Sequence, residues 1–184
     1  PEHLLAEAED WIRQRITFVA SNDPDTEPTL DWILARAEEA KKRHARHLLV
    51  IDPWDDHDFQ FSRNETETQY VGRWLRKMKA WGRAEGMSVL IRAHPTKLAK
   101  DLKTKKYPVA DGGDISGGAR WHNKTDLGLT VYRAEEGYLE VHNWKPRFRA
   151  FGKKFGQARL KLDSRTGRLS SPAQDDAQQQ QSGS

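Results

Sequence analysis

One aspartate that follows a run of aliphatic residues is the first candidate for chemistry. Residues 47–52 read His-Leu-Leu-Val-Ile-Asp, and four consecutive aliphatic residues are typical of a buried strand in a parallel sheet. Ligands gather at the carboxyl ends of such strands, so Asp52 would lie where a Mg²⁺-bound ligand is held. The alternative is structural, because Asp52 precedes Pro53 and aspartate commonly begins a turn.

Three further segments place polar side chains at the ends of apolar runs. The strand-like run that begins at Ser88 ends in His94, and residues 144–149 read Trp-Lys-Pro-Arg-Phe-Arg, with cations at Lys145, Arg147 and Arg149. Between them, residues 114–126 combine two adjacent glycines, which let a backbone approach a phosphate closely, with side chains that donate hydrogen bonds. The candidates for anion contact in this segment are Ser116, Gly117, Gly118, Arg120, Asn123 and Lys124.

Periodicity predicts the elements that position these residues. Helical spacing of apolar residues and short apolar runs bounded by turn residues indicate three helices and several strands. We expect helices over 1–15, from the N-cap Thr29 to His44, and over 66–85 with Gly86 after its end; strands over 16–19, 47–51, 88–94, 127–132 and 138–142; and a turn at Glu136-Gly137. The strand, helix, strand order predicts an α/β fold with a mainly parallel central sheet flanked by helices, followed by β-hairpin-like C-terminal strands.

The composition favours one intracellular domain with an anionic partner. The chain has 184 residues, 36% hydrophobic and 32% charged, with a net charge of +4 and a pI near 9.3. The sequence has no cysteine, no signal peptide and no long apolar run, so we expect a cytoplasmic location without membrane contact. We expect residues 1–163 to form the domain, and residues 164–184, which are polar, to form a disordered tail.

The order of these motifs resembles that in the motor domain of RecA-like, DnaB-type replicative helicases. The motifs are Asp52, His94, the 114–126 segment and the Lys-x-Arg formed by Lys145 and Arg147. The resemblance covers residues 1–163 and is greatest to the phage-type primase-helicases and the Twinkle helicases. It implies a partial RecA-like P-loop ATPase fold. It also implies a protein that hydrolyses ATP with Mg²⁺, translocates on single-stranded DNA as a ring, a hexamer in this family, and unwinds duplex DNA.

The same resemblance implies a role for each candidate. Asp52 would position Mg²⁺ through water, and His94 would sense the γ-phosphate and link it to the DNA-binding loop. The 114–126 segment would line the channel of the ring and hold the DNA backbone without reading bases. Arg147, with Lys145, would reach the nucleotide of the neighbouring subunit and stabilise charge on its γ-phosphoryl oxygens.

Two parts of the family's pattern are missing from the sequence. No GxxxxGK[ST] phosphate loop occurs, and the glutamate that serves the family as catalytic base would precede Pro1. A chain that begins Pro-Glu-His fits a C-terminal portion cut after that strand, and a primase or TOPRIM-type domain is usual further upstream in the family. We therefore expect the isolated chain to hydrolyse ATP poorly or not at all.

Two other functions remain open from the residues alone. A metal-dependent phosphodiesterase would use Asp52 with the cluster at residues 55–58, although adjacent loop residues rarely all face one ion. A non-catalytic RecA-like subunit would bind DNA or assemble a ring without a phosphate loop of its own.

Each assigned role also has a structural alternative. His94 could satisfy a turn, the 114–126 segment could be a flexible surface loop with incidental charge, and the cations around Arg147 could form a solvated strand edge. Trp121 could stack on a base or pack beneath its loop, and packing is favoured.

Overall fold

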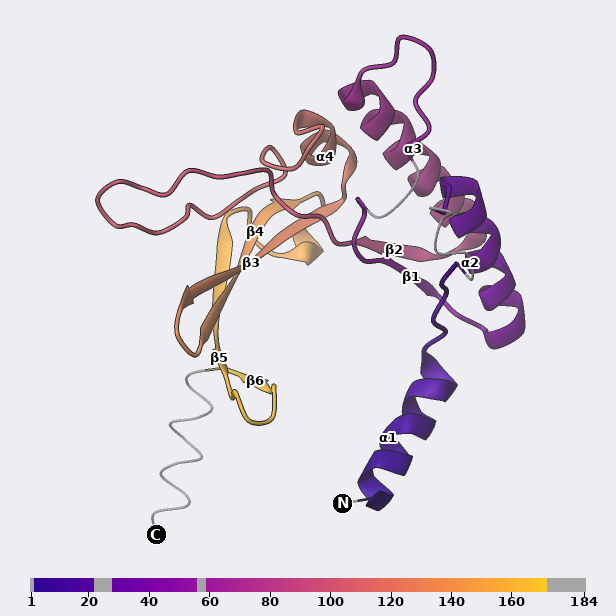
Figure 1. Cartoon of the computed structure of the whole chain (residues 1–184), viewed down its shortest axis with the longest axis horizontal. Helices are drawn as coiled ribbons and strands as arrows, with labels where there is room; N and C mark the ends of the chain where they lie inside the picture. Colours follow the sequence, from indigo (N-terminus) through magenta and orange to yellow (C-terminus); the bar gives the residue numbers. More distant parts are fainter. Residues whose placement is uncertain (1, 22–27, 56–58, 172–184) are drawn as a thin grey trace. The chain divides into compact units, whose positions relative to one another are not determined.

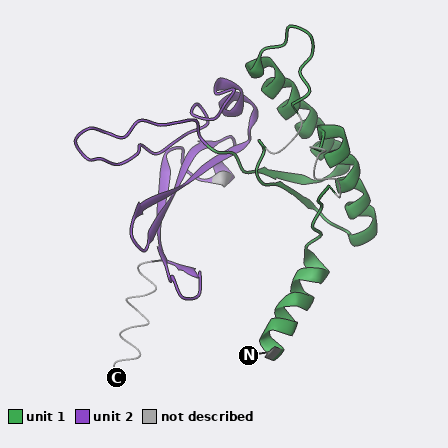
Figure 2. Ribbon diagram, viewed as in Figure 1, with its two compact units in different colours: residues 1–94 green, residues 95–184 purple. Residues whose placement is uncertain are grey.

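The computed structural model describes residues 2–21, 28–55 and 59–171 and divides the chain into two compact units. Unit 1 comprises residues 1–94 and unit 2 comprises residues 95–184 (Figure 2). The division falls inside the region that the sequence predicts as one domain.

Unit 1 contains a two-stranded parallel sheet and three helices (Figure 1). The strands are β1 (Leu48–Ile51) and β2 (Ser88–Ile91), which pair in register along their whole length. The helices are α1 (Glu2–Arg15), α2 (Leu30–His44) and α3 (Glu67–Glu85). Because β1 and β2 are parallel and in register, their carboxyl ends lie at the same edge, as the strand, helix, strand pattern predicted.

Side chains cap the helices of unit 1 where the sequence predicted helix ends. Thr29 accepts a hydrogen bond from the backbone N–H of Trp32, and Thr66 and Gln69 form a capping box at the start of α3. Gly86, at φ 62°, ends α3 in the left-handed conformation. The apolar face of α3 supplies half of the buried hydrophobic side chains of unit 1, namely Tyr70, Val71, Trp74, Leu75 and Met78.

An ion pair fastens the segment before α3 to the helix. Arg73 Nη2 lies 2.7 Å from Glu65 Oε2, and the Ser62 backbone N–H donates to the same carboxylate at 2.8 Å. The Arg73 guanidinium and the Ser62 N–H hold the pKa of Glu65 at about 2, below its ordinary value of 4.5.

The prediction for the N-terminal region is half right. The predicted helix is confirmed as α1, but residues 16–19, predicted as a strand, form no strand. Arg46 explains part of this difference, because its guanidinium donates to the Gln14 carbonyl at 2.7 Å and to the Thr17 hydroxyl at 3.1 Å. These bonds hold the end of α1 and Thr17 against Arg46, and no strand of the described residues pairs with residues 16–19.

Unit 2 is built on a four-stranded antiparallel sheet in the order β3, β4, β5, β6 (Figure 1). The strands are β3 (Leu127–Glu135), β4 (Tyr138–Pro146), β5 (Gly156–Leu162) and β6 (Leu169–Ser170), and the helices are α4 (Ala119–Lys124) and the short 3₁₀ helix η1 (Arg149–Phe151). The predicted turn at Glu136-Gly137 is confirmed, with Gly137 at φ 74°. Both strands of this hairpin are longer than the sequence predicted.

Trp144 joins the β3–β4 hairpin to the segment that precedes β3. Its ring is buried and stacks on His122 of α4, with ring centroids 5.6 Å apart. A Cβ atom at Gly128 would lie 2.3 Å from this ring, and one at Gly112 would lie 2.6 Å from it. Only glycine fits at these two positions, because the indole lies directly on the backbone.

The fold prediction therefore needs two corrections. The chain is α/β, but among the described residues parallel pairing is limited to β1 and β2, so the expectation of a mainly parallel sheet is wrong. Part of the predicted disordered tail, residues 164–170, instead forms a turn and β6, because Asp163 accepts hydrogen bonds from the Arg165 N–H at 2.8 Å and the Thr166 hydroxyl at 2.7 Å. Residues 172–184 lie outside the described residues.

We expect Glu65→Gln to remove part of the acid sensitivity of folding. The carboxylate stabilises the folded chain above about pH 4.5 and loses this contribution as the pH falls toward 2, because its pKa is lowered to about 2 on folding. In the variant, the free energy of unfolding measured in urea should depend less on pH across this window. Glu136→Gln, which removes an exposed turn carboxylate, should keep the original dependence. An unchanged slope in Glu65→Gln would contradict the assignment.

We expect Gly128→Ala to lower the free energy of unfolding by about 1–3 kcal/mol, because the added methyl group overlaps the Trp144 ring. Urea denaturation followed by circular dichroism measures the loss. The same substitution in a Trp144→Leu background should cost less, since the ring is gone. An equal cost in both backgrounds would show that the contact is unimportant.

Candidate functional site

Asp52 is held against the strand beside it. The parallel ladder continues past β1, because the Arg92 N–H donates to the Ile51 carbonyl and the Trp54 N–H donates to the Arg92 carbonyl, both at 2.9 Å. These two bonds bracket Asp52 and place its carboxylate beside the Arg92 guanidinium, whose Nη1 donates to Asp52 Oδ1. The Asp52 and Arg92 side chains are 48% and 56% exposed. The predicted metal ligand Asp52 is therefore accessible to solvent and already paired with the side chain of Arg92.

His94 lies just beyond the carboxyl end of β2 and is exposed. Asp52 and His94 thus follow adjacent strands at one edge of the sheet, as the sequence predicted. Within residues 2–21, 28–55 and 59–171, no group of three or more His, Cys, Asp or Glu side chains is arranged to hold a metal ion. Most of the alternative cluster at residues 55–58 lies outside these ranges. Among the described residues, the predicted metal ligand Asp52 therefore belongs to no three-ligand group.

The predicted DNA-binding segment forms a turn and a short helix. The Gly118 N–H donates to the Ile115 carbonyl at 2.7 Å, and Gly117 and Gly118 adopt φ values of 80° and 30°. A Cβ atom at Gly118 would lie 3.0 Å from the Gly113 carbonyl oxygen. The two glycines are therefore required by the turn itself, and α4 follows directly.

Trp121 packs beneath this turn. Its side chain is 3% exposed, and its Nε1 donates to the Ser116 carbonyl at 2.8 Å. This arrangement confirms the packing interpretation and leaves no ring face open for a base. Of the predicted contact residues, Asn123 is exposed, while Arg120 and Lys124 are half-buried.

Lys145 and Arg147 lie at the same end of β4 but make different contacts. Lys145 Nζ donates to the His122 carbonyl of α4, whereas Arg147 Nη1 pairs with Asp126 Oδ1 at 2.8 Å. The Arg147 N–H also donates to the Asp126 carbonyl at 2.8 Å. The structure thus brings the predicted Lys-x-Arg against the predicted DNA-binding segment, and Arg147 remains 47% exposed.

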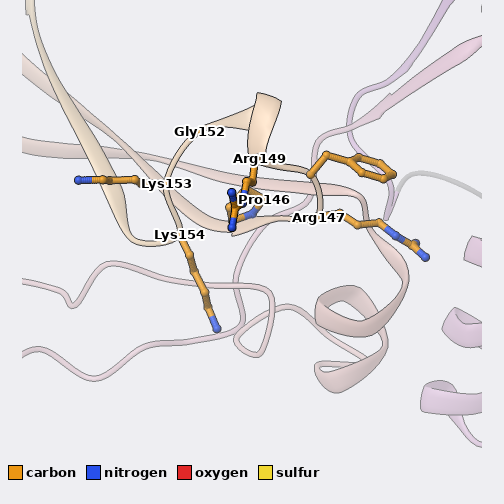
Figure 3. Close-up of a pocket in the computed structure, with 7 residues that line it drawn as sticks. Pro146, Arg147, Arg149, Gly152, Lys153 and Lys154 are labelled. Carbon is orange, nitrogen blue, oxygen red and sulfur yellow. The ribbon is translucent and has the colours of Figure 1, made fainter.

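A pocket of about 570 Å³ lies beside Arg147 (Figure 3). It is lined by Pro146, Arg147, Phe148, Arg149, Gly152, Lys153 and Lys154. Its lining carries four cations and no carboxylate, so it favours an anionic ligand.

Sequence reasoning missed several residues of these sites. Arg92 and Asp126 were not predicted as partners of Asp52 and Arg147, since a sequence does not show which charges face each other. Lys153 and Lys154 were also missed as pocket residues. The sequence did contain a signal for an anion-binding site here, because residues 147–154 contain four cations and no acidic residue.

Comparisons with known proteins bear on this geometry. The chain resembles a solved ATPase domain, with a TM-score of 0.58 and 16% identity, covering 78% of this chain and 51% of that one. It also resembles a DnaB-like replicative helicase, with a TM-score of 0.61 and 16% identity, covering 77% and 35%. These likenesses concern the fold. No protein-family model matches the chain.

A sequence relative decides the relationship. The chain is 31% identical over 175 residues to the Twinkle homolog protein, chloroplastic/mitochondrial, of Arabidopsis thaliana. The chain is thus related in sequence to a Twinkle homolog and similar in fold to a solved ATPase domain and a DnaB-like replicative helicase. The match covers 89% of the chain but only 23% of the Arabidopsis Twinkle homolog, so the chain spans about a quarter of that relative's length. None of the described helices is long and apolar enough to cross a membrane.

We expect Arg92→Gln to make the Asp52 carboxylate more available to a divalent cation. An exposed ion pair contributes up to about 1 kcal/mol, so the affinity of Asp52 for Mn²⁺, a paramagnetic substitute for Mg²⁺, should rise by up to about fivefold. Broadening of the Trp54 backbone amide signal in an NMR titration with Mn²⁺ measures this affinity.

Two controls make that titration specific. Arg83→Gln removes an arginine of α3 and should leave the Mn²⁺ dependence unchanged. Asp52→Asn should abolish the broadening at Trp54. Equal Mn²⁺ dependence in Arg92→Gln and the unmodified chain would show that Arg92 does not compete for the carboxylate.

Proposed function

We propose that this chain is part of an ATP-dependent replicative DNA helicase that moves on single-stranded DNA as a ring, a hexamer, and unwinds duplex DNA. The observation that carries the proposal is the 31% identity to the Twinkle homolog over 89% of the chain. The positions of Asp52 and His94 at one sheet edge, and of Arg147 beside the 114–126 segment, support it.

Asp52 is proposed to hold the Mg²⁺ of bound ATP. A half-exposed carboxylate at a strand end fits this ion, because Mg²⁺ keeps several water ligands and takes only one or two carboxylates. When bound with ATP, Mg²⁺ neutralises charge on the β- and γ-phosphate oxygens. Asp52 must leave Arg92 to serve as this ligand. His94, which follows the adjacent strand, is proposed to respond to the terminal phosphate.

Arg147 is proposed to act on nucleotide bound by a neighbouring copy. Its planar guanidinium suits charge on phosphoryl oxygens, and its half-exposed side chain is held by a single ion pair with Asp126. A phosphate that draws Arg147 away from Asp126 would alter the end of the DNA-binding segment. Lys145, which donates to the α4 carbonyl of His122, fixes the strand end that carries Arg147.

Single-stranded DNA is the proposed ligand of the 114–126 segment. Its donors suit the DNA backbone, because phosphate contacts do not depend on base identity and a motor must pass every base. The side chains and backbone proposed for this contact are those of Ser116, Gly117, Gly118, Arg120, Asn123 and Lys124.

A non-catalytic DNA-binding or ring-assembly subunit is the second candidate. Such a subunit would use the exposed cations of unit 2, Arg147 among them, without hydrolysing ATP itself. The metal-dependent phosphodiesterase is the lesser alternative, and most of the 55–58 cluster that it would use lies outside the described residues. The cytoplasm of a bacterial or phage-infected cell remains the proposed compartment, although the name of the Arabidopsis relative assigns that protein to chloroplast and mitochondrion.

We expect Arg147→Ala, in the full-length protein, to lower DNA-stimulated ATP hydrolysis by about 10³-fold or more without changing the circular dichroism spectrum, because an arginine finger contributes this much. A phosphate-release assay measures the rate. Arg168→Ala, a substitution in the turn before β6, should hydrolyse normally. Normal turnover by Arg147→Ala would refute the finger.

Mixing variants tests whether Arg147 acts across an interface. Arg147→Ala subunits retain Asp52, and Asp52→Asn subunits retain Arg147, so mixed rings should recover part of the activity that each variant lacks. No recovery, with ring assembly intact by light scattering, would place Arg147 outside the neighbour's site. A full-length protein that binds DNA without hydrolysing ATP would favour the non-catalytic subunit.

A further inference from the structure

The loop between β4 and β5 carries more charge and aromatic surface than its turn requires. Residues 147–155 contain four cations and no carboxylate. Phe148 is 54% exposed and Phe155 is 76% exposed, and Lys154 Nζ lies 4.9 Å from the centre of the Phe155 ring. Large aromatic side chains exposed beside cations are typical of surfaces that bind single-stranded nucleic acids.

Phe155 has an unfavourable backbone conformation. Its φ is 59°, in the left-handed region, where a bulky side chain is strained and glycine or asparagine is preferred. A hydrogen bond from its N–H to the Asn143 carbonyl at 2.7 Å holds it there. A phenylalanine that is both strained and exposed does not stabilise the fold, so its ring is better explained by a ligand.

The directions of the cations show what kind of ligand fits. In Figure 3 the side chains of Lys153 and Lys154, the two lysines of this loop, point in different directions. A compact anion would need converging donors, whereas an extended polyanion with regularly spaced charges matches diverging ones. A single strand also offers unpaired bases to an exposed ring, which a duplex does not.

We propose that the β4–β5 loop binds single-stranded nucleic acid, with phosphates along Arg149, Lys153 and Lys154 and a base stacked on Phe155. Its position supports this site, because the loop begins where the 114–126 segment ends. Pro146 pairs with Leu127, and the Arg147 N–H donates to the Asp126 carbonyl. A strand held by the 114–126 segment therefore continues onto this loop, a path that rests on the proposed function.

Fluorescence anisotropy of a labelled oligothymidylate, titrated with the full chain at several salt concentrations, tests the site. Phe155→Asn suits the left-handed backbone, so it should fold at least as stably as the unmodified chain while weakening binding by about fivefold or more. The Lys153→Gln/Lys154→Gln double variant should weaken binding and reduce the slope of log K against log salt by about 1.4, or 0.7 for each lost phosphate contact.

Matched controls separate local from general effects. Phe18→Asn removes a phenylalanine that is 80% exposed in unit 1, and the Arg165→Gln/Arg168→Gln double variant removes two cations from the turn before β6. Both should bind as the unmodified chain does. Full affinity in Phe155→Asn, or an unchanged salt slope in the double lysine variant, would overturn the proposal.

Further measurements distinguish this site from binding of other ligands and test it separately from the proposed function. Equal affinity for a duplex, or Phe155-dependent sedimentation with phosphatidylglycerol vesicles but no oligonucleotide binding, would also overturn it. The Arg120→Gln/Lys124→Gln variant tests the 114–126 segment separately. If that variant keeps full affinity for the oligonucleotide while Phe155→Asn loses affinity, the 114–126 segment is not a DNA-binding site and the loop site is supported.

Discussion

The positions of the candidate residues in unit 2 depend on one close contact, the Trp144 indole lying on the backbone of Gly112 and Gly128. Because neither glycine carries a Cβ atom, the indole can lie directly on both backbone segments and stack on His122. The contact ties the 111–126 region to the β3–β4 hairpin. The Lys145 bond to the His122 carbonyl and the Arg147 pair with Asp126 are formed at the end of the hairpin that this contact fixes.

Two of the residues expected to meet a nucleotide are each paired with an opposite charge from a neighbouring strand or segment. Asp52 is paired with Arg92, and Arg147 is paired with Asp126. All four side chains are two-fifths exposed or more, so each pair contributes at most about 1 kcal/mol. Pairs this weak orient a side chain but are readily exchanged for a stronger ligand such as a metal ion or a phosphate.

Local signals in the sequence predicted much of unit 1 and less of unit 2. Thr29, Thr66 and Gly86 mark helix ends through short-range hydrogen bonds and φ preferences, and the structure has these caps. The strand predicted at residues 16–19 failed because β propensity does not supply a pairing partner. The turn and β6 after Asp163 were hidden by a polar composition, since side-chain bonds to Asp163, not burial, define that turn. Long-range pairings such as Asp52 with Arg92 leave no local pattern at all.

Within the described residues, Asp52 belongs to no group of three or more acidic or histidine side chains that could hold a metal ion. Mg²⁺ takes one or two carboxylates and keeps several waters, so Asp52 would hold it more tightly when phosphate oxygens of a nucleotide supply further ligands. Without nucleotide, Asp52 retains Arg92, because the backbone of Arg92 is hydrogen-bonded to Ile51 and to Trp54, the residues that flank the Asp52-Pro53 pair. Exchange of Arg92 for the metal would then change the segment that leads directly to His94, which gives the nucleotide site a physical connection to the end of β2.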